Sequence, residues 1–260
     1  MSVDGFHNAS PSWPLPVRGG AYERPPPELI AAFADISAAT ACAKLHHMGI
    51  SRTFVAGPMP FRHGRKVVGS VLTLQFMPRR EDIASGMAQE YVERHTALWA
   101  VLDTAQHGDV LVVDARGATH TGCLGEMLIR YFATRGGAGI VVDGRIRDTP
   151  KLQDLDLPIW SLGATPHYAS QSELFPWAYD VPVAVGGVLA LPGDIVVADD
   201  DGAVVVPRAY AEELIEKAQI HEDWEVFSRL RIAQGGALSK YYPLDDEASA
   251  EYQQWRDARD

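Results

Sequence analysis

Cysteine is scarce in this sequence, and long uncharged hydrophobic runs are lacking. The 260 residues include only two cysteines, Cys42 and Cys123, which form neither a CxxC metal motif nor the dense set of a disulfide-rich secreted protein. We therefore expect a reducing compartment, most simply the cytoplasm. No stretch approaches the roughly 18 apolar residues of a membrane helix, and residues 1–20 do not follow the pattern of a secretion signal. The sequence predicts no membrane span.

Basic residues are also few relative to acidic ones. Lysine and arginine together number 23, against 34 aspartates and glutamates, which gives a formal net charge of -11 at pH 7. A surface with that excess repels nucleic acid unless a local basic patch overrides it, and the sequence contains no such patch. With 47% hydrophobic and 22% charged residues, the composition is that of an ordinary folded protein. Nucleic acid is not an expected partner.

The distribution of proline suggests how the chain is divided. Prolines cluster in residues 1–27, where apolar periodicity is weak, so we expect an extended arm there rather than a domain. The length fits one large domain or two small ones, and we expect a single domain over residues 28–236. Gly235-Gly236 ends the last helical pattern. The acidic and aromatic residues 237–260 form a C-terminal tail.

Apolar spacing predicts several helices and strands within this domain. A short helix is predicted from Glu28, and Ser37 can cap a second helix over residues 38–48. Residues 67–76 are rich in β-branched side chains and predict a strand. The apolar period of residues 209–232 predicts a long amphipathic helix.

A βαβ unit is predicted in the middle of the chain. Residues 110–114 and 140–143 are short apolar runs typical of buried strands, and residues 124–134 between them are helical. Such runs indicate parallel strands covered on both faces, so we expect an α/β fold. A further strand is predicted at 158–161, and the turns within 181–207 indicate antiparallel strands. Ligands of such units gather at the carboxyl ends of the strands.

Two carboxylates and a guanidinium are predicted to meet at this edge of the sheet. Glu126 opens the helix after the first strand, and Arg147 and Asp148 follow the second strand. The 20 residues between Glu126 and Arg147 are about what a helix, a tight turn and a short strand consume. Carboxylates suit a hard cation such as Mg²⁺ or Mn²⁺, which keeps several waters. We predict a metal site at Glu126 and Asp148, with Arg147 beside it.

The start of the same helix adds a place for an anion. Gly125 lets a ligand approach closely, and the first free N–H groups, near Met127 and Leu128, attract an anion such as a substrate carboxylate. A metal, an anion site and an arginine suit a 2-oxo acid, because metal and arginine stabilise the enolate as a C–C bond breaks. This combination is typical of an aldolase or decarboxylase that needs no Schiff-base lysine.

The same residues also have structural explanations, which the sequence leaves open. Asp148 precedes Thr149-Pro150 and is well placed to cap the next helix. Glu126 is favoured in a first helical turn by the helix dipole alone, and Arg147 is otherwise a solvated side chain. His167 lies in a loop that either borders the cleft or is simply exposed. The spacing of Glu126 from Arg147-Asp148 favours the metal site.

The motifs of this region resemble a known family. Residues 108–166 contain, in order, GDVLVVDARG, GCLGEML, GIVVDGRIRD and PIWSLGATP. They are similar to the class II pyruvate aldolases typified by 4-hydroxy-4-methyl-2-oxoglutarate/4-carboxy-4-hydroxy-2-oxoadipate (HMG/CHA) aldolase, a family that also contains the regulator of RNase E activity. The likeness continues weakly to Pro207.

This resemblance implies a fold, an assembly and roles for the site residues. It implies a compact β/β/α swivelling-domain fold, a homotrimer or homohexamer with sites between subunits, and a need for Mg²⁺ or Mn²⁺. By resemblance, Asp148 binds the metal directly, Glu126 holds it through water, and Arg147 contacts the keto or enolate oxygen. The backbone amides of Met127 and Leu128 would hold the pyruvyl carboxylate.

We therefore expect a metal-dependent lyase that cleaves a 4-hydroxy-2-oxo acid to pyruvate and a second carbonyl compound through a metal-stabilised enolate. Oxaloacetate decarboxylation is an expected side activity, because both reactions pass through pyruvate enolate. The alternative is a non-enzymatic, protein-binding module like the regulator of RNase E. That branch has a glycine where this chain has Glu126, which favours the enzyme. A lyase acting on a sugar-derived 2-oxo acid is a third hypothesis.

Overall fold

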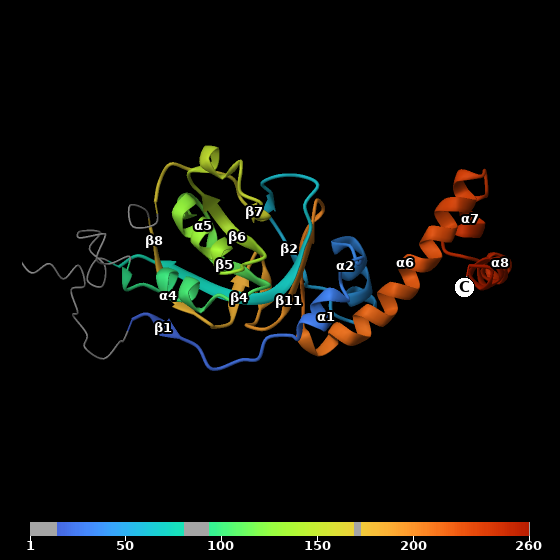
Figure 1. The fold of residues 1–260 in the computed structure, drawn as a ribbon, viewed down its shortest axis with the longest axis horizontal. Coiled ribbons are helices and arrows are strands. Elements are labelled where there is room, and N and C mark those ends of the chain that lie inside the picture. The colour runs from blue at the N-terminus through green and yellow to red at the C-terminus, as the bar shows by residue number, and fades with distance from the viewer. Residues whose placement is uncertain (1–14, 81–93, 169–172, 260) are drawn as a thin grey trace, which may run out of the picture. The chain divides into compact units, whose positions relative to one another are not determined.

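The chain forms two compact units, shown as a ribbon in Figure 1. The computed structural model describes residues 15–80, 94–168 and 173–259. The first unit ends at Ala211 and the second begins at Glu212, so the division falls at the start of a long helix. The expected limits of the domain, 28–236, and of the tail remain predictions.

The first unit is built on one mixed sheet. Its strand order is β2-β12-β11-β4-β5-β6-β7-β3, with β8 paired to β4 and β1 paired to β8. The adjacent strands β4, β5, β6 and β7 run parallel to one another. The pairings made by β2, β3, β11 and β12, and the pairing of β8 with β4, are antiparallel. The strands are β1 (Val17–Arg18), β2 (Phe54–Val55), β3 (Met59–Pro60), β4 (Val67–Pro78), β5 (Asp109–Leu124), β6 (Gly139–Ile146), β7 (Ile159–Ser161), β8 (Leu174–Tyr179), β9 (Val183–Val185), β10 (Val188–Ala190), β11 (Ile195–Asp199) and β12 (Gly202–Val206).

The predicted βαβ unit is confirmed by β5, α5 (Glu126–Thr134) and β6. Val110 pairs with Gly139, and Val112 pairs with Val141, in a parallel register. Strand β6 then runs parallel to β7. The carboxyl ends of β5 and β6 consequently lie at the same edge of the sheet.

Apolar side chains of β5 alternate between the two faces of the sheet. Leu111 and Val113 belong to the core beneath α4 (Ala97–Thr104) and α5, and these two helices cover the same face (Figure 1). Val110 and Val112 belong to the core on the other face, beneath the β9–β10 hairpin. Hairpin, sheet and helices form three layers, which confirms the expected β/β/α arrangement within an α/β fold.

Short helices complete the first unit. Helix α1 spans Pro27–Ala31 and α2 spans Ala38–His47. The Ser37 hydroxyl accepts a hydrogen bond from the Thr40 N–H at 3.0 Å, so the predicted N-cap of α2 is confirmed. A 3-10 turn, η1 (Thr149–Leu152), follows β6, and another, η3 (Arg208–Tyr210), precedes α6.

The second unit is helical and has an aromatic core. It contains most of α6 (Ala211–Ala233), together with α7 (Leu238–Tyr241) and α8 (Asp246–Asp257). The buried residues of this aromatic cluster are Phe227, Tyr241, Ala248 and Tyr252. Two folded helices therefore occupy the region for which the sequence indicated only an acidic and aromatic tail.

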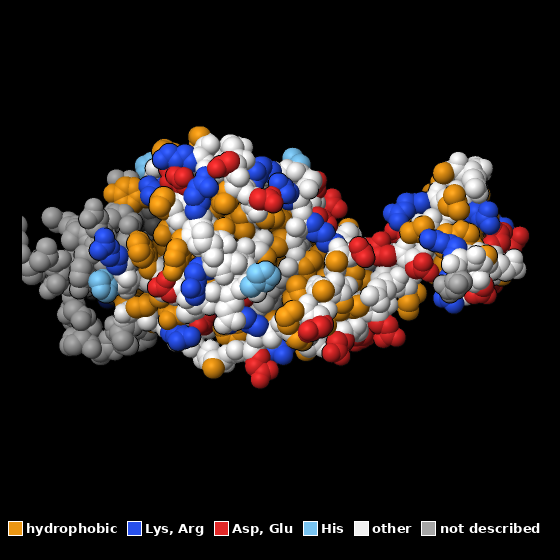
Figure 2. All heavy atoms as spheres, in the orientation of Figure 1, with side chains coloured by type: hydrophobic (Ala, Val, Ile, Leu, Met, Phe, Trp, Pro, Cys, Tyr) orange, Lys and Arg blue, Asp and Glu red, His pale blue; other side chains and the backbone are white. Residues whose placement is uncertain are grey.

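The surface agrees with the composition of the chain. On the face drawn in Figure 2, basic side chains of the first unit are interspersed with acidic and apolar ones rather than gathered in one patch. Within the described ranges, no helix is both long enough and apolar enough to cross a membrane.

Candidate functional site

An irregular strand brings the two predicted site segments together. Past residue 114, β5 rejoins β6, with Gly122 opposite Arg145. This second contact carries the start of α5 to the segment that follows β6. There the Arg147 N–H donates a hydrogen bond to the carbonyl oxygen of Leu124 at 3.0 Å. The sequence did not predict this second pairing, because it expected the strand to end at residue 114.

Glu126, Arg147 and Asp148 meet at one carboxylate oxygen. The Glu126 N–H donates to Asp148 Oδ2 at 3.3 Å, and Arg147 Nε lies 3.6 Å from the same oxygen. The side chains of Arg147 and Asp148 are 38% and 36% exposed, so a ligand can reach both. The structure thus brings the three predicted residues into one place.

Asp148 has an unusual backbone conformation for a residue with a side chain. Its φ of 60° and ψ of 26° lie in the left-handed helical region, which costs an L-residue roughly 1–2 kcal/mol. The residue directly precedes η1, yet its side chain makes no capping hydrogen bond there. The structural explanation of Asp148 as a helix cap is therefore wrong. Its carboxylate instead accepts from the first N–H of α5.

Gly125 is required by the closeness of these groups. A Cβ atom at this position would lie 2.7 Å from Arg147 Nε and 2.8 Å from Asp148 Oδ2, which is closer than atoms in contact normally approach. The backbone of Gly125 is extended, with a φ of -109°, so its role does not depend on a positive φ. The missing side chain leaves room for the arginine and the aspartate beside α5.

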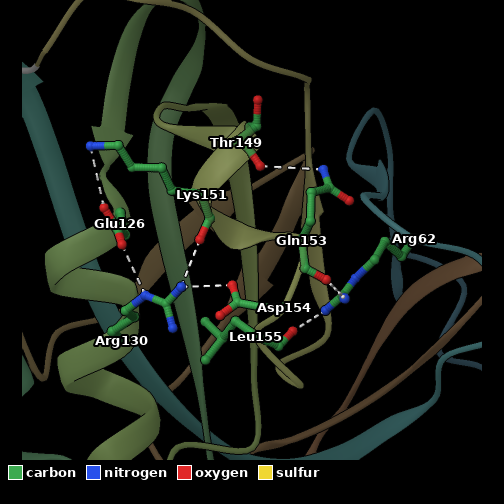
Figure 3. Close-up of polar contacts among 8 residues, drawn as sticks. All are labelled: Arg62, Glu126, Arg130, Thr149, Lys151, Gln153, Asp154 and Leu155. Carbon is green, nitrogen blue, oxygen red and sulfur yellow. Dashed lines mark hydrogen bonds and ion pairs between the residues drawn. The ribbon is translucent and has the colours of Figure 1, made fainter.

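The Glu126 carboxylate faces two cations. It lies 3.0 Å from Arg130 Nε and 3.6 Å from Lys151 Nζ, as Figure 3 shows. Its side chain is 19% exposed. Within the described residues, Glu126 contacts Asp148 through its backbone N–H. The Glu126 carboxylate is therefore paired with Arg130 and Lys151, whereas the Glu126 backbone is bonded to Asp148.

Arg130 joins α5 to the turn after Asp148. Its Nη2 donates to the Lys151 carbonyl oxygen and to Asp154 Oδ1, each at 2.7 Å (Figure 3). Hydrogen bonds to Asp154 and Glu126 hold the pKa of Arg130 above its ordinary value. The hydrogen bond from Arg130 in turn lowers the pKa of Asp154. Arg130 thereby fixes both the Glu126 carboxylate and the segment that carries Asp148.

Two arginines of this network were missed by the sequence analysis. Arg62 donates to the carbonyl oxygens of Gln153 and Leu155 and holds the far end of the same turn (Figure 3). Arg130 lies four residues after Glu126, and that spacing is a known signal for a helical ion pair. The contact of Arg62 joins segments distant in sequence and has no comparable local signal.

The start of α5 presents the predicted N–H donors. The first hydrogen bond within α5 runs from the Ile129 N–H to the Gly125 carbonyl oxygen at 3.1 Å, so the N–H groups of Met127 and Leu128 precede the helical pattern. The Met127 side chain is 74% exposed. This terminus can accept an anion next to Asp148 and Arg147.

An aromatic ring that the sequence did not single out borders the site. The guanidinium carbon of Arg147 lies over the Tyr168 ring, 5.5 Å from its centroid. The preceding residue, His167, is exposed and contributes its carbonyl oxygen to a hydrogen bond from the Gly122 N–H at 3.0 Å. The sequence predicted that His167 lies in a loop that either borders the cleft or is simply exposed. A contact between its side chain and the substrate stays a prediction.

Asp143 and Cys123 lie near the site but inside the fold. Asp143 accepts hydrogen bonds from the N–H groups of Ala115 at 2.5 Å and Gly186 at 3.1 Å. Burial, the largest cause, raises the pKa of Asp143 to about 6. Burial also raises the pKa of the Cys123 thiol, which makes this thiol a poor nucleophile.

The donor set suits a hard cation that keeps most of its waters. Within the part of the chain that the structure describes, no group of three or more His, Cys, Asp or Glu side chains is placed to hold a metal. Asp148 offers an accessible carboxylate, and Glu126 offers a second one nearby. Mg²⁺ is commonly bound by one or two carboxylates and several waters. The accessible Asp148 carboxylate is therefore compatible with a hard cation, whereas the Glu126 carboxylate is already paired with Arg130 and Lys151.

Comparison with known sequences identifies related proteins. A family model described as RraA-like, Aldolase/RraA, matches residues 34–205. A putative 4-hydroxy-4-methyl-2-oxoglutarate aldolase of Halalkalibacterium halodurans is 33% identical over 160 residues, which are 62% of this chain and 69% of that protein. Residues 34–205, which the family model matches, include the whole candidate site.

Solved structures share the fold. RraAS2 of Streptomyces coelicolor, described as an unusual member of the RNase ES inhibitor RraA protein family, is 61% identical with a TM-score of 0.75, covering 81% of this chain and 100% of that one. An uncharacterized protein from Pseudomonas syringae is 24% identical with a TM-score of 0.70, covering 85% of this chain and 99% of that one. The second likeness concerns the fold alone.

Proposed function

Because the chain belongs to the RraA-like Aldolase/RraA family, we propose that it is a divalent-metal-dependent carbon–carbon lyase. It would cleave a 4-hydroxy-2-oxo acid to pyruvate and a second carbonyl compound, and it would decarboxylate oxaloacetate as a side activity. Both reactions generate the enolate of pyruvate, so one set of groups serves both. Family membership alone allows aldolases and RNase inhibitors, and the site must distinguish them.

The arrangement around Asp148 Oδ2 carries this proposal. One accessible carboxylate, one guanidinium and the N-terminal amides of a helix lie together at the sheet edge. Asp148 would bind Mg²⁺ or Mn²⁺ directly, and Glu126 would hold it through water. The cation, when bound, would supply Lewis-acid polarisation of the substrate's carboxylate and keto oxygens.

The chain's own residues would bind and orient the substrate. The N–H groups of Met127 and Leu128 would hold the pyruvyl carboxylate, and Gly125 leaves room for it. As the substrate's 4-hydroxyl gives its proton to water, the C3–C4 bond breaks, its electron pair forms the C2=C3 bond of the enolate, and the C2 carbonyl pair moves onto the oxygen. Arg147 would donate hydrogen bonds to that oxygen and stabilise its growing negative charge. The enolate then takes a proton from water at C3 to give pyruvate. Arg130 would keep the Glu126 carboxylate in place.

Pyruvate release from oxaloacetate tests the proposal. Turnover is expected with Mg²⁺ or Mn²⁺ and is expected to stop with EDTA. Arg147→Ala should lower kcat/KM by an amount equivalent to about 2–4 kcal/mol of transition-state stabilisation, the scale for losing one positioned donor. Arg52→Ala, which removes an exposed arginine, serves as the matched control. Unchanged turnover in Arg147→Ala would remove this residue from the mechanism. Separately, a panel of 4-hydroxy-2-oxo acids that includes sugar-derived acids would identify the substrate.

A regulatory protein-binding function is the second candidate. The 61% identity to RraAS2 of Streptomyces coelicolor favours it, because that protein is assigned to an RNase ES inhibitor family. Inhibition of RNase ES by the purified chain measures this function directly. Inhibition without pyruvate release from any 2-oxo acid tested would favour the regulator, whereas metal-dependent turnover would favour the lyase.

The proposed enzyme is a cytoplasmic homotrimer or homohexamer. Both cysteines are free thiols, as a reducing compartment requires. Trp99, Met127 and Tyr131 are large apolar side chains that α4 and α5 leave exposed, and the Tyr131 hydroxyl joins the two helices through Asp103 at 2.7 Å. Such a surface is suited to contact between subunits. Light scattering of the eluting protein measures the assembly.

A further inference from the structure

We infer that Tyr168 is a positioning residue for Arg147. The kinetic part of this inference rests on the proposed function, because Arg147 is there the donor to the forming enolate oxygen. The Arg147 guanidinium carbon lies 5.5 Å from the centroid of the Tyr168 ring, within the roughly 6 Å over which a cation is attracted to a ring face. Tyr168 itself does not contact the reacting atoms in this assignment.

The guanidinium is held from two directions. Its central carbon lies over the Tyr168 ring, while Asp148 Oδ2 lies 3.6 Å from its Nε. The Arg147 side chain is 38% exposed, so packing in the core does not by itself fix its rotamer. The ring and the carboxylate together restrict where the guanidinium can lie, and its partial exposure leaves it accessible to a ligand.

Tyr168 is itself attached to the sheet. It forms a parallel bridge with Gly122, and the Gly122 N–H donates to the His167 carbonyl oxygen at 3.0 Å. A Cβ on Gly122 would lie 2.3 Å from that oxygen and 3.3 Å from Arg147 Cβ. Only glycine at this position lets the loop approach closely enough to place the ring beside Arg147. The backbone of half-buried Tyr168 is therefore attached to the sheet beside Arg147.

Loss of the ring should affect turnover more than substrate binding. The charge on the substrate's C2 oxygen grows toward the transition state, so an orientation of Arg147 that favours this charge lowers the barrier selectively. A misaligned arginine can still attract the anionic substrate. We therefore expect kcat to fall while KM changes less.

Steady-state kinetics of two substitutions at one position test this inference. With oxaloacetate and Mg²⁺, Tyr168→Leu should lower kcat by about two- to fivefold, the range of an exposed cation–π contact. Tyr168→Phe keeps the ring face and should retain the kcat of the wild type. Tyr210→Leu, at a tyrosine that is 40% exposed on η3, is the matched control. An unchanged kcat in Tyr168→Leu, or an equal loss in Tyr168→Phe, would overturn the inference.

An NMR measurement on the ligand-free protein tests the contact without any activity. The Arg147 Nε–Hε signal, assigned by its loss in Arg147→Lys, should be shifted upfield by the ring in wild type and in Tyr168→Phe. In Tyr168→Leu it should move toward the position of solvated arginines, and an unmoved signal would refute the contact. If Tyr168→Leu has a Tm well below that of the wild type, Tyr168→Gln is measured in its place. Wild-type protein that releases no pyruvate would refute the proposed function alone, and the NMR result would still decide the role of Tyr168.

Discussion

Gly125→Ala tests whether the site depends on the close approach of Arg147 and Asp148 to α5. The added Cβ would lie 2.7 Å from Arg147 Nε and 2.8 Å from Asp148 Oδ2, about 0.6–0.7 Å short of the 3.4 Å at which ordinary contact begins. One or both side chains must therefore move outward. Both carry out central steps in the proposed reaction, so a small displacement should have a large effect.

The size of the effect follows from this displacement. A misplacement of about 1 Å can cost roughly 100-fold in rate, so we expect kcat/KM for oxaloacetate to fall about 10- to 100-fold. The Mg²⁺ concentration for half-maximal rate should rise, because Asp148 is among the displaced groups. Backbone strain is not expected, since Gly125 has an extended φ of -109° and ψ of 175°. The free energy of unfolding should fall by about 1 kcal/mol or less, as for other changes at an N-cap.

Gly20→Ala is the matched control for this experiment. A Cβ at Gly20 would meet nothing within 4 Å, so this glycine-to-alanine change should leave kcat/KM unchanged. Urea unfolding of both variants separates a local effect on the site from a general loss of stability. If Gly125→Ala turned over oxaloacetate as fast as the wild type at every Mg²⁺ concentration, the contact of Gly125 with the two side chains would have no part in the reaction.

Three further predictions follow from single groups. Burial raises the pKa of Asp143 to about 6, above the value of about 4 in unfolded chains. The folded state thus keeps a proton that the unfolded state has lost, and stability should fall by up to about 3 kcal/mol as pH rises from about 4 to 6; urea unfolding should show this slope in wild type and not in Asp143→Asn. Arg130→Met should lower kcat/KM and raise the Mg²⁺ requirement, because Glu126 loses its 3.0 Å partner, and a profile equal to wild type would contradict this. In the native protein, Ellman's reagent should modify Cys42 and reach buried Cys123 only after denaturation.

Local patterns were sufficient for the central elements of the fold. The apolar runs of β5 and β6 place alternate residues, such as Leu111 and Val112, in the two cores, and the Ser37 cap acts within a few residues. The added strand pairing at Gly122 and the helices of residues 237–260 were not predicted. The Gly122 pairing joins segments distant in the sequence, which a local pattern does not contain, whereas α8 begins at a local N-cap in which the Asp245 side chain accepts from the Ala248 N–H.

The same distinction applies to the site. The spacing of Glu126, Arg147 and Asp148 was enough to predict that they meet, because a βαβ unit has a narrow range of geometries. The direction of each side chain was not predictable. Asp148 is turned by a left-handed backbone conformation, and Tyr168 reaches Arg147 from a separate loop. Such features depend on how segments are packed after the chain has folded.

The backbone conformation of Asp148 agrees with the proposed ligand site. Asp148 adopts a conformation that is unfavourable by roughly 1–2 kcal/mol for a residue with a Cβ, and its side chain does not cap η1 in return. Strain of this kind persists where the surrounding structure imposes it, and it is concentrated at ligand sites. A carboxylate that accepts from the first amide of α5 also stabilises that helix terminus, a gain that a lyase and a regulator share. A site that must present the same carboxylate to a cation, beside an arginine and an anion-binding helix terminus, requires that direction.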